Sequence, residues 1–214
     1  MKIELPVYTT KLPVKDISVE FKPLVVKEEK IIASAKETGS PMDGYNTLIK
    51  LIDTKTDIDT NDLTETDLIH LMLQIRKKSI GEKFKTGFNC PYTGQPVSLE
   101  VNCSDIKVAG DSKSKNVLTD KLSIDLKIPK NFSDISSCIE SIESIKEKVE
   151  FSTLSQEQRN EIIDSLPILT KNKIENAVKS LLHYEHTLEY ESAGTKRKIK
   201  LSSAEDFFTL LFVM

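Results

Sequence analysis

One stretch decides how this chain folds: Leu63–Asn102, LTETDLIHLMLQIRKKSIGEKFKTGFNCPYTGQPVSLEVN. Its Thr64-x-x-Asp67 pattern predicts a helix start, because a threonine oxygen accepts a free backbone N–H and an aspartate suits the positive end of the helix dipole. Gly81 predicts the helix end, because glycine adopts the left-handed C-cap conformation at little cost. Apolar residues recur between these two signals at the spacing of one buried helix face: Leu68, Leu71, Met72, Ile75 and Ile80.

After Gly81 the apolar spacing changes from helical to alternating. Lys83–Lys85 and Val97–Val101 each alternate apolar with polar residues, which predicts strands with one buried face. Pro91–Gly94 lies between them and is rich in residues that reverse the backbone. The stretch therefore predicts a helix followed by a β-hairpin.

This helix and hairpin resemble the centre of the T4-like bacteriophage baseplate hub family (T4 bacteriophage base plate protein family). In that family a helix ends in an Arg-x-x-Ser-x-Gly-Glu signature, which Arg76–Glu82 matches, and leads into a strand with a Cys-x-x-Cys turn. A second piece, Lys11–Pro13 followed by Phe21–Ile31, is similar to the family's opening Pro-Phe-x-x-Lys-Glu-Glu-Lys motif. The two pieces cover roughly the first half of the chain in the family's order.

The resemblance implies a structural or assembly protein of the baseplate hub in a contractile-tailed bacteriophage (a myovirus). Such a protein acts through protein interfaces and is not an enzyme. The expected partners are other hub and tail proteins, and the expected location is the virion tail baseplate, with assembly in the host cytoplasm. An assembly chaperone that leaves before the particle is complete is an alternative in the same family context.

The turn departs from the family pattern at one position. Thr93 stands where relatives have the second cysteine after Cys90. A thiolate pair is the usual anchor of a structural zinc site, and a hydroxyl is a poor replacement. Cys90 and Cys103 remain weak zinc candidates at the two ends of the hairpin, although a buried apolar cysteine is the more common state. We therefore expect no cofactor.

Composition limits the classes of function. The chain has 214 residues, a net charge of −3 and a pI near 5.8, so it has no broad positive field to attract nucleic acid or an anionic membrane. No window approaches 18 apolar residues, which argues against a membrane span. Three widely spaced cysteines do not make a disulfide framework and suit a reducing cytosol.

The pattern of elements predicts an α+β fold. An N-terminal region, residues 1–130, holds proline-bounded strands, helices at Val26–Lys36 and Met42–Ile52, the central helix with its hairpin, and a further strand at Leu122–Pro129. A C-terminal region, residues 131–214, is predicted to be mainly helical and to end in a hairpin and an apolar helix.

Several local sequence patterns predict the helices and the hairpin of the C-terminal region. One helix is expected along a stripe from Ile135 to Val149, a second at the capping box Ser155–Gln158, and a third with Thr170 as its cap. Thr187–Glu191 and Lys196–Leu201 predict a hairpin.

Catalytic candidates are few. His70 lies beside the apolar stripe of the central helix, where a packing role is expected. His183-x-x-His186 could bring two imidazoles together on a helix end, but it lacks a third ligand at helical spacing. A small metal-dependent hydrolase would need both of these histidines and a cysteine or acid to converge, and it is the least favoured reading.

Two groups of residues are the candidates for a protein interface. Arg76, Lys77 and Lys78 complement the helix dipole or contact an acidic partner. The C-terminal helix is apolar almost all round and must be buried, either in its own domain or in a neighbour; its interface candidates are Phe207, Phe208 and Phe212.

Overall fold

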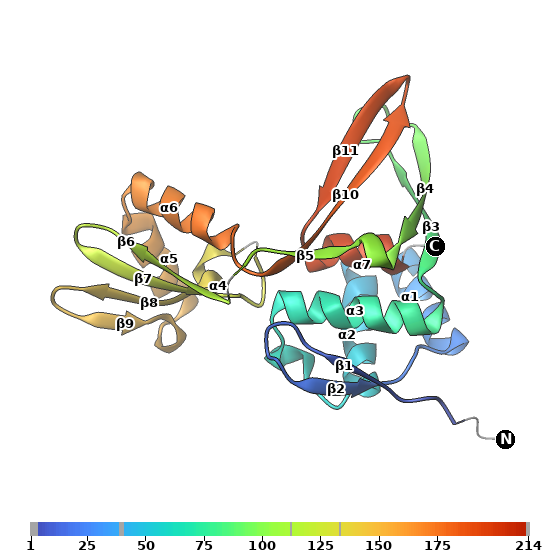
Figure 1. The fold of residues 1–214 in the computed structure, drawn as a ribbon, viewed down its shortest axis with the longest axis horizontal. Coiled ribbons are helices and arrows are strands. Elements are labelled where there is room, and N and C mark those ends of the chain that lie inside the picture. The colour runs from blue at the N-terminus through green and yellow to red at the C-terminus, as the bar shows by residue number, and fades with distance from the viewer. Residues whose placement is uncertain (1–3, 39–40, 112, 133, 213–214) are drawn as a thin grey trace. The chain divides into compact units, whose positions relative to one another are not determined.

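The computed structural model describes residues 4–38, 41–111, 113–132 and 134–212, and it confirms the α+β class (Figure 1). The described chain forms two compact units. Unit 1 comprises residues 1–63, 67–107 and 184–214, and unit 2 comprises residues 64–66 and 108–183. These units are interleaved in sequence and do not follow the expected division at residue 130.

Unit 1 is built on the predicted central helix, α3 (Glu65–Ser79). The other elements of this unit are the strands β1 (Tyr8–Lys11), β2 (Ser18–Phe21), β3 (Lys83–Asn89), β4 (Pro96–Asn102), β10 (His183–Ser192) and β11 (Thr195–Leu201), the helices α1 (Val26–Thr38), α2 (Pro41–Lys55) and α7 (Ala204–Phe212), and the short turns η1 (Thr60–Asp62) and η2 (Cys103–Asp105). Both ends of α3 and both N-terminal helices agree with the predicted positions.

The core of unit 1 surrounds α3, because its apolar face is almost completely buried. Leu71, Met72 and Ile75 have no exposed surface, as the helical spacing requires of residues on one inward face. They belong to one cluster with residues from the other elements: Leu12, Phe21, Ile32, Leu48, Ile52, Phe84, Val101, Phe207 and Phe208. The apolar C-terminal helix is therefore buried in its own unit.

Three antiparallel hairpins complete unit 1. β1 pairs with β2, β3 pairs with β4 so that Lys83 faces Asn102, and β10 pairs with β11 so that Ser192 faces Thr195. The last hairpin turns at Ala193 and Gly194, which both have positive φ, as a two-residue turn with matching twist requires. The predicted β3–β4 and β10–β11 hairpins are confirmed.

Unit 2 contains an antiparallel sheet with the strand order β6-β7-β8-β9. Its elements are β5 (Lys107–Ala109), β6 (Ser114–Leu118), β7 (Leu122–Lys127), α4 (Ile135–Cys138), β8 (Ile139–Ser144), β9 (Lys148–Glu150), η3 (Phe151–Thr153), α5 (Gln156–Ser165) and α6 (Ile168–Val178). Ile124 and Leu126 of β7 are fully buried. Gly110 approaches the Leu181 carbonyl so closely that a Cβ atom would lie 2.2 Å from its oxygen, so the chain entering unit 2 meets the chain leaving it.

The predicted helix from Ile135 to Val149 is wrong. Only Ile135–Cys138 is helical, and the rest forms β8 and β9. The apolar spacing that suggested a helix is broken at Ile145, which is 91% exposed in the turn between the strands. Pairing of β8 with β7 on one side and β9 on the other satisfies the backbone, and isoleucine is well suited to strands.

The two helices that follow were predicted with mixed success. α5 begins at the expected capping box, in which Ser155 and Gln158 exchange side-chain to backbone hydrogen bonds. Thr170 does not cap α6: the helix begins two residues earlier at Ile168, after Pro167, and Thr170 is buried inside it. Pro167 is the N-cap residue, and its carbonyl oxygen accepts the N–H groups of Thr170 and Lys171, so the first turn of the helix already includes Thr170.

Candidate protein interface at the end of the central helix

Arg76, the first residue of the signature, is a core residue in this structure. Its side chain is 2% exposed, its Nε donates a hydrogen bond of 2.8 Å to the Leu211 carbonyl oxygen, and its guanidinium lies 4.7 Å from the centre of the Phe84 ring. Burial lowers its pKa, while the charge of Glu29 acts in the opposite direction. Nη1 is buried without a hydrogen-bond partner among the described residues. Arg76 therefore holds the end of α7 against α3 and β3.

Ser79 and Gly81 connect the helix end to two other segments. The Ser79 hydroxyl donates to the Ile75 carbonyl at 2.6 Å and accepts the Leu24 backbone N–H at 2.8 Å. Gly81 adopts a φ of +123°, which non-glycine residues rarely take. The next residue, Glu82, accepts the Cys103 N–H through its carbonyl oxygen. The signature thus joins α3 to the segment before α1, to α7 and to the β3–β4 hairpin.

The segments joined in this way surround a groove with a volume of about 230 Å³. Most of its lining is apolar, and two carboxylates, Glu29 and Glu37, also face it. We call it the α1–α3 groove and define it by its lining residues: Leu24, Val25, Val26, Glu29, Ile32, Ala33, Glu37, Ser79, Ile80 and Phe212. All of them belong to unit 1.

The remaining interface candidates divide by exposure. Lys78 is exposed and its ammonium lies 4.8 Å from the centre of the Tyr8 ring, while Lys77 is half-buried. Phe207 and Phe208 are buried in the core of unit 1. Phe212 is half-buried and lines the α1–α3 groove. Arg76, Phe207 and Phe208 can therefore influence a partner only through the surfaces that they hold in place, and direct contact stays a prediction for Lys77, Lys78 and Phe212.

The turn between β3 and β4 is attached to β10 of the other long hairpin. Cys90 is buried, and its Sγ lies 3.4 Å from the Tyr190 hydroxyl. The Thr93 hydroxyl lies 2.7 Å from that of Ser192. Burial raises the pKa of Cys90, but hydrogen bonds from these hydroxyl groups lower it more, to about 6. Thr93, the departure from the family turn, thus forms a hydrogen bond between two hairpins.

The zinc candidates do not share one site with other ligands. Cys103 lies in the main core of unit 1, and burial raises its pKa. Cys90 lies in a separate small cluster with Val97 and Tyr190. Among the described residues, no group of three or more His, Cys, Asp or Glu side chains is placed to hold a metal ion.

The histidines take structural positions. His70 lies between the Thr10 and Tyr184 hydroxyls, with 2.7 Å from one ring nitrogen to each. Burial lowers its pKa, with the charge of Asp67 acting against this effect and that of Lys77 adding to it. His183 and His186 lie on strand β10, so their predicted place on a helix end is wrong.

Asp67 has a role that sequence reasoning did not identify. The Thr-x-x-Asp pattern assigned it to the helix dipole, but its fully buried carboxylate also accepts the backbone N–H groups of Val14 and Lys15, the first at 2.8 Å. The turn after β1 is thereby held on α3. No local pattern indicates this role, because the two N–H groups that Asp67 binds lie 53 and 52 residues away in the chain.

No described helix is long and apolar enough to cross a membrane. Residues 5–209 match the protein family described as T4 bacteriophage base plate protein. No curated protein and no solved structure matches the chain. The family match includes the signature at the end of α3 and extends through unit 2 into α7. The chain therefore belongs to the T4 bacteriophage base plate protein family.

Proposed function

We propose that this protein is a structural component of the baseplate hub of a contractile phage tail and that it works through protein interfaces, without catalysis. Family membership supports a baseplate structural protein. The finer proposal depends on one observation: the signature residues Arg76, Ser79 and Gly81 are used to join segments around the α1–α3 groove. Residues that shape a surface are what an assembly protein needs.

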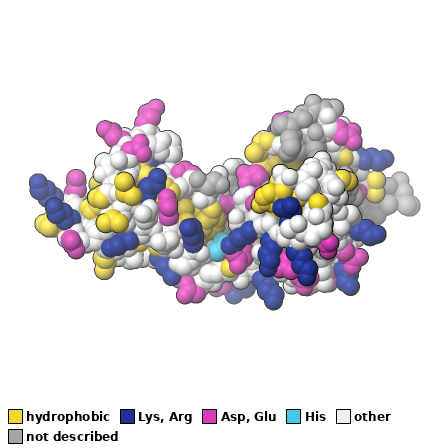
Figure 2. Space-filling view, turned by 90° about the horizontal axis from the view of Figure 1, so that it is seen from above, with side chains coloured by type: hydrophobic (Ala, Val, Ile, Leu, Met, Phe, Trp, Pro, Cys, Tyr) yellow, Lys and Arg dark blue, Asp and Glu magenta, His cyan; other side chains and the backbone are white. Residues whose placement is uncertain are grey.

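The distribution of charge agrees with this role. Figure 2 shows side chains of both signs interspersed over the visible face, with small groups of hydrophobic side chains among them. A surface without one dominant sign does not attract nucleic acid or anionic membranes over long distances. We propose hub and tail proteins as the partners, the virion baseplate as the location, and the host cytoplasm as the place of assembly.

Quantitative mass spectrometry of purified phage tails tests the hub role. A structural component is expected at a fixed ratio to the other hub proteins in mature virions and in isolated baseplates. Co-expression with the neighbouring tail-gene products should also recover it in a defined complex. Presence in assembly intermediates but absence from virions would identify an assembly chaperone and overturn the proposal.

A further inference from the structure

We propose that the α1–α3 groove binds a segment of a neighbouring baseplate protein that inserts one large apolar side chain and flanks it with lysine or arginine. This inference rests on the proposed function and specifies the chemistry of the partner at the same site. Three features of the groove carry it: its size with its apolar walls, its two carboxylates that form no ion pair among the described residues, and the hydrogen bonds that hold its walls in place.

The size and the walls of the groove suit a single side chain. A volume of about 230 Å³ is smaller than the roughly 300–1,000 Å³ of typical small-molecule pockets, and it suits one large anchoring side chain. Val26 is 67% exposed and Ile80 is 43% exposed at its rim, while Leu24 and Ile32 form buried parts of its wall. Covering such exposed aliphatic surface with an apolar anchor is favourable, at about 25 cal/mol per Å².

The charge of the groove selects a basic partner. Glu29 and Glu37 lie on the face of α1 that also carries Val26 and Ala33, at three- and four-residue spacing. Neither carboxylate has an ion-pair partner among the described residues, and no lysine or arginine lines the groove. The neighbouring Glu28 differs, because it forms a 2.6 Å ion pair with Lys55. Cations on a partner would supply what Glu29 and Glu37 lack.

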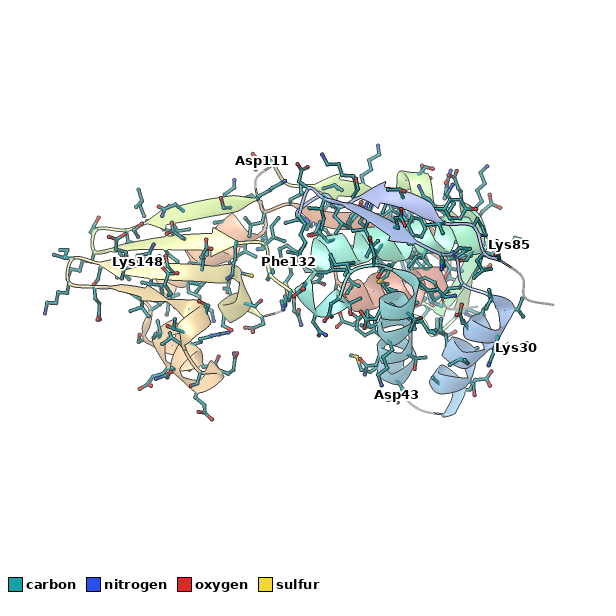
Figure 3. All side chains as sticks on the ribbon, turned by 90° about the horizontal axis from the view of Figure 1, so that it is seen from below. Lys30, Asp43, Lys85, Asp111, Phe132 and Lys148 are labelled. Atoms are coloured by element: carbon teal, nitrogen blue, oxygen red, sulfur yellow. The ribbon has the colours of Figure 1, made fainter. Side chains whose placement is uncertain are left out.

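The nearest guanidinium is already engaged within unit 1. Arg76 acts electrostatically on Glu29, but it is buried, donates to the Leu211 carbonyl and stacks on Phe84. Its side chain therefore does not occupy the groove. Lys30, on the same helix α1 and labelled in Figure 3, is exposed and does not line the groove either.

The groove is formed before a partner arrives. The hydrogen bond from the Leu24 N–H to Ser79 fixes one wall to the end of α3, and that from Arg76 to the Leu211 carbonyl fixes the turn that carries Phe212. Walls held by such bonds lose little conformational freedom on binding, so more of the contact energy appears as affinity. Two copies that met groove to groove would place Glu29 and Glu37 opposite the same two carboxylates, so we assign the groove to a basic segment of another protein.

Two synthetic peptides test the proposal on the full-length protein. Both have the same length and one central phenylalanine; one flanks it with lysines and the other with glutamates. Fluorescence anisotropy at low salt should show the lysine peptide binding at least about tenfold more tightly, and this preference should shrink as salt increases. The double variant Glu29→Lys, Glu37→Lys should reverse it. Equal binding of the two peptides would overturn the inference.

A substitution that fills the groove gives a second test, and the same substitution at a neighbouring position is its matched control. Ala33→Trp places a large side chain at a position lining the groove, and Ser34→Trp makes the same change at the next, exposed position of α1, which does not line it. The lysine peptide should lose at least about tenfold in affinity with the first variant and keep it with the second. Unchanged affinity with Ala33→Trp, in a variant whose circular dichroism matches the parent, would contradict the inference.

The outcomes separate the partner chemistry from the hub role. If the lysine peptide binds as expected but virions lack the protein, the groove assignment holds and the hub proposal fails. If virions contain the protein but charge reversal has no effect on peptide preference, the hub proposal holds and the groove assignment fails. Sedimentation velocity tests the other occupant: a dimer that Ala33→Trp converts to a monomer would show that a second copy fills the groove, against the proposal.

Discussion

Arg76 looks like a surface cation in the sequence, but in the structure it is a buried residue that stabilises the core. Three successive basic residues end α3, and their sequence position suits the helix dipole equally well. Only Arg76 faces inward, because it follows the buried residues Met72 by four positions and Leu73 by three, which places it on their side of the helix. Its planar group can donate to a carbonyl and stack on a ring at the same time, which lysine cannot do.

Replacing Arg76 by alanine should therefore destabilise the protein by about 2–4 kcal/mol, because it leaves a cavity in the core and removes the donor to the Leu211 carbonyl. Urea denaturation followed by circular dichroism measures the change. Lys78→Ala, on the same helical turn, removes an exposed side chain over Tyr8 and should cost under about 1 kcal/mol. Equal effects of the two substitutions would contradict the structural role of Arg76.

His70 makes the stability of the protein depend on pH. Its pKa is lowered from 6.5 in the folded protein, chiefly by burial, so the unfolded chain binds a proton at a higher pH than the folded chain. The free energy of unfolding should therefore rise with pH between the folded pKa and about 6.5. Below the folded pKa, His70 is protonated in both states, and the protein no longer has the extra stability that it gains from burying a neutral imidazole.

The measurement is denaturation at several pH values between about 5 and 7.5 for the parent and His70→Gln. The variant should show a shallower pH dependence. Some dependence should remain, because burial also lowers the pKa of His186. Identical slopes for the two proteins would show that His70 does not titrate in this way.

At the scale of elements, the two long hairpins of unit 1 are joined by polar contacts near their turns. Thr93 contacts Ser192 and Cys90 contacts Tyr190, while Arg197 of β11 lies 4.7 Å from the centre of the Tyr92 ring. A two-stranded ribbon is marginally stable alone, so each hairpin gains from the other.

A double-mutant cycle tests this junction. Thr93→Val and Ser192→Ala should each cost about 1 kcal/mol, and together they should cost less than the sum, with a coupling of about 0.5–1 kcal/mol, because both remove the same hydrogen bond. Thermal and urea unfolding of the four proteins provides the numbers. Additive effects would mean that the hydroxyl pair does not join the hairpins.

At the scale of the molecule, most of unit 2 is a segment inserted in the sequence between two parts of unit 1. The chain leaves unit 1 after Lys107 and returns at Tyr184. Within unit 2 the two passing segments meet, since the Asp111 N–H donates to the Ser180 carbonyl at 3.3 Å and Gly110 lies against Leu181. Insertions of this kind are tolerated where the ends of the insert lie close together.

Replacing residues 112–179 by a short glycine-serine turn should therefore leave unit 1 folded. The ends that the new turn must connect are already hydrogen-bonded to each other, so closure costs little entropy. Cooperative urea unfolding and dispersed amide resonances would confirm a folded unit 1. A chain without cooperative unfolding would show that unit 1 depends on unit 2.

The sequence by itself determined the parts that depend on neighbours in the chain. The capped helix from Glu65 to Ser79, the hairpins beside Gly94 and Gly194, and the capping box at Ser155 follow from local turn and cap chemistry, and all were predicted. The signature at Arg76–Glu82 also pointed to the family to which the chain belongs.

The tertiary structure alone decided what depends on distant partners. Ile139–Ser144 is a strand because β7 and β9 pair with it, and its own residues fit a helical stripe as well. Arg76 is buried because the Leu211 carbonyl, 135 residues away, accepts its hydrogen bond, and the α1–α3 groove exists because three separate segments meet there. A local pattern does not specify which distant segment will pack against it. The burial of a residue and the shape of a groove are therefore determined only when the chain packs.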